Sequence, residues 1–197
     1  MLAVFSLFCL STFATAQIPD KIIYKGKEYK LHSNPLELYF TKEPDKRPKS
    51  DIMSSALWRG YIATFEIEDN ILFLKDIETM YYEGNERKWR SVLSEVFPDQ
   101  KKIKIAWMTG LLIIPYGEMK NYVHMGYAST YENYLLFEVN EGNIVKERDL
   151  KGEEYEKFKN KQFEFFKNTE KYKELVREMK EKDPDRSDEF IEHFLRI

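Results

Sequence analysis

Cysteine is almost missing from this chain, and its scarcity limits the available chemistry. The single cysteine, Cys9, lies in an apolar stretch at the N-terminus. If this stretch is removed from the mature protein, disulfides, thiolate catalysis and cysteine-ligated metal sites are excluded. The bulky Phe8 stands just before Cys9, where a lipoprotein signal has a small residue, so we do not expect lipid attachment.

Histidine is also scarce, and the familiar glycine-rich motifs are missing. His32, His124 and His193 are far apart and form no H-E-x-x-H or other paired spacing. Calcium-type acidic loops, Walker-type loops, G-x-G-x-x-G and G-x-S-x-G are absent from the sequence as well. The sequence therefore contains none of the usual motifs for binding a metal ion, for binding a nucleotide or for the nucleophile elbow of a hydrolase. We expect neither a metal site nor a cofactor.

Beyond the N-terminus the chain lacks long apolar runs and an excess of one charge. Its 31 Lys and Arg are finely mixed with 34 Asp and Glu, which gives no positive field to attract nucleic acid. The apolar stretch at residues 103–116 is broken by Lys104, Gly110 and Pro115, so we expect no integral membrane segment in the mature chain. With 43% hydrophobic and 15% aromatic residues, the chain is expected to form a packed globule.

The first sixteen residues have the outline of a secretory signal peptide. They carry no charge, are almost entirely apolar from Met1 to Leu10, and place Ala14 and Ala16 in the A-x-A arrangement that precedes a signal-peptidase cut. The mature chain would begin at Gln17, in the periplasm or outside the cell. The positive charge that normally precedes the apolar run is missing. A misassigned start codon and a leader retained as an anchor are the alternatives.

The hydrophobic pattern predicts an α+β fold. We expect a mostly antiparallel sheet of hairpins, one short packed helix and a C-terminal helical extension. The expected organisation is a signal peptide at 1–16, a β-rich domain at 17–149 and the helical extension at 150–197.

Two hairpins give the clearest strand signals. Residues 22–31 fold back around Gly26, and residues 61–77 alternate apolar and polar side chains on either side of Asp69 and Asn70. Because most links between the expected strands are too short for crossover helices, antiparallel pairing is expected. Further strands are expected at 103–107, 111–114, 135–139 and 144–146.

Helical periodicity occurs in three segments. Residues 88–97 repeat apolar side chains at the helical period until Pro98, which predicts the short packed helix. An aromatic stripe in a segment rich in Lys and Glu predicts a long helix over 153–181. Pro184 then interrupts the pattern, and residues 190–195 predict a terminal helix.

The densest group of chemically capable side chains lies at residues 122–132. It contains His124, whose imidazole titrates near neutral pH and could act as a general base. Glu132 would orient this imidazole while Tyr127 or Tyr131 polarises a substrate, so a small hydrolase is one hypothesis. The alternative is structural, with His124 donating to a backbone carbonyl and the tyrosines packing with their hydroxyls at the rim.

A second group surrounds Arg59 at the start of a predicted strand. Trp58 and Tyr61 flank it, and its guanidinium would point to the face opposite Trp58. Recognition of an anion and a buried ion pair with a glutamate that fixes strand register are equally supported. The candidate binding residues of both groups are Trp58, Arg59, Tyr61, Tyr122, His124, Tyr127 and Tyr131.

Four strings between Ile22 and Val145 carry a resemblance to other proteins. They are LWRGYIATFEI, ILFLKDI, WMTGLLIIPYGEMKNYVHMGYASTYE and LLFEVNEGNI. This pattern resembles one that recurs in a group of small uncharacterised bacterial proteins. No activity is established for the group, so the resemblance implies no catalytic role. It implies that the Arg59 group and residues 122–132 belong to one module to which the helical tail is added.

Two functions follow from these patterns. The leading hypothesis is an exported, non-enzymatic binding or interaction protein, for example one that confers immunity or captures an envelope ligand. It rests on the aromatic excess, because aromatic residues and arginine dominate binding hot spots. The partner would be a protein or a small ligand. The alternative is a small hydrolase that uses His124 with Glu132 and a tyrosine.

The N-terminus of the purified protein tests the export prediction. If a signal peptidase cuts after Ala16, N-terminal sequencing begins at Gln17 and the protein is recovered from the envelope or the medium. Recovery of Met1 on protein from the cytoplasmic fraction would contradict export.

Overall fold

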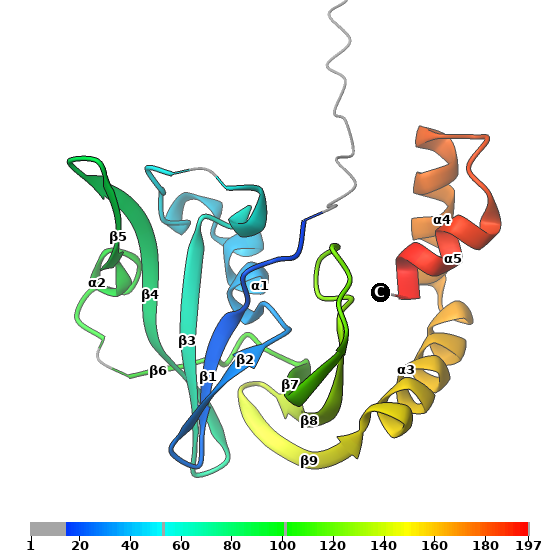
Figure 1. Cartoon of the computed structure of the whole chain (residues 1–197), viewed down its shortest axis with the longest axis horizontal. Coiled ribbons are helices and arrows are strands. Elements are labelled where there is room, and N and C mark those ends of the chain that lie inside the picture. Colours follow the sequence, from blue (N-terminus) through cyan, green and yellow to red (C-terminus); the bar gives the residue numbers. More distant parts are fainter. Residues whose placement is uncertain (1–14, 53, 101, 197) are drawn as a thin grey trace, which may run out of the picture.

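The computed structural model describes residues 15–52, 54–100 and 102–196. Within these residues the chain is α+β, with a nine-stranded, largely antiparallel sheet and five α-helices (Figure 1). The predicted signal peptide lies outside the described residues, apart from Thr15 and Ala16. Among the described helices, none combines the length and the apolar character that a membrane crossing requires.

Seven strands form one continuous path, and two others branch from it. Along this path the order is β2-β1-β3-β4-β9-β8-β7, while β5 and β6 each pair with β4. The strands are β1 (Asp20–Tyr24), β2 (Lys27–Leu31), β3 (Tyr61–Glu68), β4 (Ile71–Glu83), β5 (Glu86–Ser91), β6 (Ile103–Lys104), β7 (Gly110–Asn121), β8 (Thr130–Asn140) and β9 (Asn143–Lys151).

The two ends of this path meet. Just after β2, the His32 amide donates to the Ile113 carbonyl of β7 (2.8 Å), and the Ile113 amide donates to Ser33 Oγ (3.0 Å). The sheet therefore curls around its apolar core and covers part of both end strands. Buried residues of this core include Ile22, Leu31, Phe65, Leu74, Ile77, Leu112, Ile114 and Phe137.

Both predicted hairpins are confirmed. Lys25 and Gly26 have φ values of 50° and 74° between β1 and β2, the geometry of a two-residue type I′ turn. Asp69 and Asn70 turn the chain in the same way between β3 and β4. The alternation predicted for β3 is also confirmed, because every second residue over 61–67 lies in the core.

The predicted helix over residues 88–97 is wrong. Trp89 lies in β5, opposite Met80 of β4, in a hairpin that projects from the sheet (Figure 1). Only Leu93–Val96 is helical (α2). The spacing of Trp89 from the later apolar residues imitates a helical period, but its cross-strand partner determines its structure.

The sheet is mostly antiparallel, as predicted, with one exception. Strands β1 and β3 run parallel, with Lys21 opposite Thr64. The chain passes from β1 to β3 through β2 and helix α1 (Pro35–Lys42), which the sequence analysis missed. Because β1 and β3 are not consecutive strands, the lengths of the links between consecutive strands do not reveal this parallel pair.

The expectation of one short helix beside a single long one is also corrected. The long helix is two helices, α3 (Gly152–Lys167) and α4 (Glu170–Lys182). Thr169 caps α4, because its hydroxyl accepts a hydrogen bond from an amide in the first turn (3.2 Å). Because the apolar stripe continues across the break between α3 and α4, the period of the stripe does not reveal the break. The terminal helix is present as α5 (Asp188–Arg196).

Helix α3 follows β9 directly and packs against the sheet. Tyr155 of α3 stacks on Tyr134 of β8 with 3.9 Å between ring centroids, and Leu136 joins them in a buried cluster.

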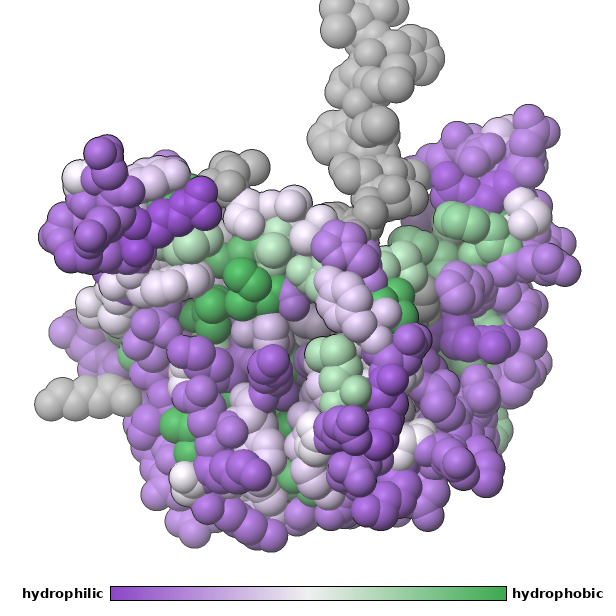
Figure 2. Space-filling view, viewed as in Figure 1, coloured by the Kyte–Doolittle hydropathy of each residue, from purple (hydrophilic) through white to green (hydrophobic). Residues whose placement is uncertain are grey.

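A separate cluster holds Ile62 of β3 and Met80 of β4. Figure 2 shows hydrophobic surface gathered over the upper part of these two strands, on a face that is otherwise mostly hydrophilic.

Two glycines with the same backbone geometry test how closely β9 is fixed to its neighbours. Gly142 (φ +75°) and Gly26 (φ +74°) both occupy two-residue turns, but a Cβ at Gly142 would lie 2.8 Å from the Ile105 carbonyl oxygen, whereas Gly26 has open space. We expect Gly26→Ala to lower the free energy of unfolding by about 1 kcal/mol. Gly142→Ala should cost about 1–3 kcal/mol more, because the added methyl overpacks the turn. Urea unfolding measures both, and equal losses would contradict the close packing.

Candidate functional site

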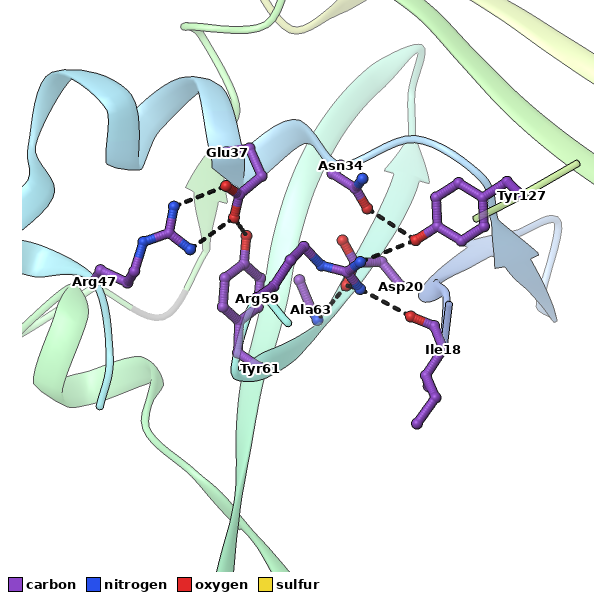
Figure 3. A network of polar contacts seen from close by, with 9 residues as sticks. All are labelled: Ile18, Asp20, Asn34, Glu37, Arg47, Arg59, Tyr61, Ala63 and Tyr127. Atoms are coloured by element: carbon purple, nitrogen blue, oxygen red, sulfur yellow. Dashed lines mark hydrogen bonds and ion pairs between the residues drawn. The ribbon is translucent and has the colours of Figure 1, made fainter. Parts of the chain in front are cut away.

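Arg59 lies at the centre of a buried network of polar contacts (Figure 3). It precedes β3, and its side chain is 0% exposed. Its guanidinium donates to Asp20 Oδ1 (3.3 Å), the Ile18 carbonyl (2.9 Å) and Tyr127 Oη (3.0 Å). Asp20 Oδ1 also accepts from the Ala63 amide of β3 (2.9 Å). The network therefore joins β1, β3 and the connection after β7.

The buried carboxylate beside Arg59 belongs to Asp20, not to the glutamate that the sequence analysis considered. Burial raises the pKa of the Asp20 carboxyl to about 6, although Arg59 and the Ala63 amide oppose the rise. Burial lowers the pKa of Arg59, but Asp20 and Tyr127 more than offset this, so Arg59 stays charged. Because both side chains are sealed from solvent, the structure favours the structural role of Arg59 over anion recognition.

A second ion pair adjoins the first. Arg47 donates two hydrogen bonds to the Glu37 carboxylate of α1 (2.9 and 2.7 Å), and Tyr61 Oη donates to the same carboxylate (2.7 Å). Burial raises the pKa of Glu37, but these hydrogen bonds lower it by more than burial raises it. The pKa of Glu37 is therefore below its ordinary value. The Tyr61 ring lies beside the Arg59 side chain (Figure 3). Tyr61, a candidate binding residue, is fully buried between the two ion pairs.

Tyr127 belongs to the loop at residues 122–129, which connects β7 to β8 and which we call the 122–129 loop. Its hydroxyl accepts from Arg59 and donates to Asn34 Oδ1 (3.0 Å). The backbone amide of Gln17 donates to the Gly126 carbonyl (3.0 Å), which fixes the tip of the loop to the N-terminal segment. The loop is therefore held from its inner side at two points.

The candidate catalytic side chains make their hydrogen bonds with other residues. His124 Nδ1 is 2.7 Å from Tyr122 Oη, while Glu132 Oε2 accepts from the Glu118 amide (3.4 Å). Within the described residues, no hydrogen bond joins His124 to Glu132, or either of them to Tyr127. The structure does not assemble the acid, base and tyrosine as one hydrogen-bonded group.

The remaining candidate binding residues differ in their exposure. Tyr122 is 59% exposed on the loop, and Tyr131 is half-buried at the start of β8. Trp58 is 48% exposed in the turn before β3, beside a shallow hollow of about 170 Å³. The structure thus joins Arg59 to Tyr127 but places Trp58 at a different surface from that of Tyr131.

An open groove lies between the β7–β8 hairpin and the beginning of α3. Its volume is about 1010 Å³, and it contains Tyr131 and side chains of both charges. We call it the charged groove. Its lining includes Lys120, Glu132, Lys151, Glu153, Lys157 and Asn160.

A smaller cavity of about 250 Å³ adjoins the charged groove, with which it shares Thr130, Tyr134 and Glu156. We call it the ring cavity, because His32 and Tyr127 also line it as a stacked pair. Burial and the nearby Lys30 lower the pKa of His32 to about 4, so its imidazole is neutral at pH 7. The apolar part of its lining includes Ile113, Val123, Met125 and Ala128.

Sequence reasoning missed His32 and Tyr155 as site residues. His32 follows the first hairpin with no chemical neighbour in the sequence, and only the closure of β2 onto β7 brings it to the 122–129 loop. Tyr155 was part of the stripe that predicted a helix, which indicated burial but not its neighbours.

Comparison with family models, with curated proteins and with solved structures finds no match to this chain.

Replacement of the buried Arg59 side chain tests which parts of the structure it holds together. Arg59→Met leaves Asp20 buried without its partner, and we expect the free energy of unfolding to fall by about 3–5 kcal/mol. Amides of the 122–129 loop should also exchange with deuterium faster under native conditions. The matched control is Arg47→Met, which breaks the partly exposed pair with Glu37 and should cost about 1 kcal/mol.

Urea unfolding and hydrogen exchange at pH 7 compare these two variants. Tyr127→Phe is a milder third variant, because it removes only the hydroxyl that links the loop to Arg59. Equal stability losses in the two arginine variants, with unchanged exchange in the loop, would contradict the central role of Arg59.

Proposed function

We propose that this protein is a non-enzymatic binding protein that recognises a protein partner through the 122–129 loop and the charged groove. The observation that carries the proposal is the groove itself. At about 1010 Å³ it is open and lined by charges of both signs beside the half-buried ring of Tyr131, which suits a segment of polypeptide. Charges of both signs can pair with a partner of complementary pattern and so contribute specificity.

The attachment of the loop supports this proposal. Binding costs less free energy when the contacting segment is already ordered, and Arg59 and Gln17 hold the 122–129 loop from its inner side. The loop exposes Tyr122, and tyrosine supplies a large contact area with little loss of side-chain entropy.

The hydrogen bonds of the catalytic candidates favour binding over hydrolysis. A general base needs an orienting partner within hydrogen-bond reach, and His124 is paired with Tyr122 instead of Glu132. The export prediction remains part of the proposal, with the partner in the periplasm or outside the cell. Immunity to a protein toxin is one form that such a function would take.

Site-specific photocrosslinking tests the proposal. A benzophenone amino acid replaces Tyr122 on the loop or, as a matched control, Tyr82 on the β4–β5 hairpin, which is 53% exposed. In cells that express the protein, we expect a discrete protein crosslink from position 122 and none from position 82. The crosslink should be lost when Asn160→Trp places a bulky ring in the charged groove.

Three outcomes would overturn the proposal. They are no product from position 122, identical products from both positions, and a product from position 122 that persists in Asn160→Trp. N-terminal sequencing of the crosslinked protein tests export in the same sample.

A further inference from the structure

Two stacked pairs of rings line the ring cavity. His32 stacks on Tyr127 with 4.6 Å between ring centroids and 15° between ring planes. Tyr134 and Tyr155 stack at 3.9 Å and 18°. The Tyr131 ring meets His32 edge-on at 5.6 Å. Such flat walls favour flat ligands, because aromatic rings pair best by offset stacking or edge-to-face contact.

Four polar side chains in the same lining have no hydrogen-bond partner within the described residues. They are the imidazoles of His32 and His193 and the hydroxyls of Thr130 and Tyr155. Ser129 is different, because its hydroxyl exchanges hydrogen bonds with the backbone of Val123. A ligand that offers a donor and an acceptor would satisfy groups that the fold leaves unpaired.

Apart from the imidazole of His193, the polar groups of the lining carry no net charge. His32 is neutral at pH 7, since burial lowers its pKa, and burial also raises the pKa of Tyr127 and Tyr155. Glu156 and Lys159 line the cavity and pair with each other at 3.3 Å. A charged ligand would lose its hydration without gaining an opposite charge of its own.

The size of the cavity limits the ligand to one ring system. A cavity of about 150 Å³ holds benzene, and sites for drug-sized molecules begin at about 300 Å³. At about 250 Å³ the ring cavity fits one ring with a small polar substituent. Because it adjoins the charged groove, a ring attached to a polypeptide in that groove can enter it as well.

We infer that the ring cavity is a binding site for an uncharged, planar ring that carries a hydrogen-bonding group, with phenol as the simplest example. The inference rests on the proposed function insofar as the cavity opens onto the groove proposed for the partner. The ring has two sources with the same chemistry, the side chain of a tyrosine in that partner and a free phenolic molecule.

Titration of the full chain with four probes tests the inference. 4-Methylphenol and N-acetyl-L-tyrosinamide are uncharged, while 4-hydroxybenzoate and 4-hydroxybenzylamine add a negative or a positive charge to the same ring. We expect the better uncharged probe to bind with a Kd of about 1 mM or below and to shift the NMR signals of His32. The charged probes should bind at least tenfold more weakly, a loss of about 1.4 kcal/mol.

Three variants locate the site. Tyr155→Phe removes a hydroxyl that lines the cavity, and Tyr24→Phe is its matched control because the Tyr24 hydroxyl bonds to Glu147 outside the cavity. We expect the first to weaken binding at least fivefold and the second to leave it unchanged. Ala128→Leu fills the cavity and should abolish binding, with the NMR spectrum reporting that each variant is folded.

The two uncharged probes distinguish the sources of the ring. If the tyrosinamide binds more tightly than 4-methylphenol, the added amides contact the groove and a partner's side chain is the ligand. If 4-methylphenol binds more tightly, a free molecule is the ligand. The inference is overturned if neither binds at 10 times the expected Kd, if charged probes bind equally well, or if Tyr155→Phe and Tyr24→Phe behave alike. These results do not depend on the crosslink from position 122. The proposal of a ring-binding cavity and the proposal of a protein partner are therefore tested separately.

Discussion

The ion pair between Arg59 and Asp20 is the constraint on which the arrangement of the site depends. Moving two charges out of water costs several kcal/mol, and the cost is recovered only if the surrounding groups are fixed in place. Asp20 Oδ1 and the Arg59 guanidinium meet this condition through contacts with β3, the N-terminal segment and Tyr127. Asp20 Oδ2 and Arg59 Nε are buried without partners among the described residues. The pair therefore specifies geometry more than it adds stability.

This geometry extends from β1 to the ring cavity. Asp20 accepts the Ala63 amide at the beginning of the parallel β1–β3 pair, so the ion pair and the strand register support each other. The hairpin that begins at Asp20 ends at Leu31, and the next residue, His32, bonds to β7 and closes the sheet. Tyr127 has two roles, since its hydroxyl meets Arg59 and its ring stacks on His32. One residue thus connects the buried network with the cavity wall.

Local patterns predicted much of this fold, and non-local contacts explain the errors. The alternation of β3 and the turns at Gly26 and Asn70 depend on neighbouring residues, so the sequence was sufficient to predict them. Trp89 was assigned to a helix because the period of a short apolar segment cannot reveal its pairing with β4. Residues 122–132 were recognised as a functional candidate, yet their partner His32 lies about ninety positions earlier in the chain. Side chains that converge only through sheet closure leave no spacing to detect.

The high aromatic content is divided between two physical tasks. Some rings, such as Phe65 and Phe137, are sealed in the core, where their area stabilises the fold without a polar partner. Tyrosines near the 122–129 loop remain partly accessible, and the hydroxyl of Tyr155 has no partner within the described residues. Phenylalanine would be sufficient there for packing alone, because the ring of Tyr155, not its hydroxyl, makes the stack on Tyr134. Retaining the hydroxyl at the wall of a cavity is therefore easier to explain by recognition than by packing.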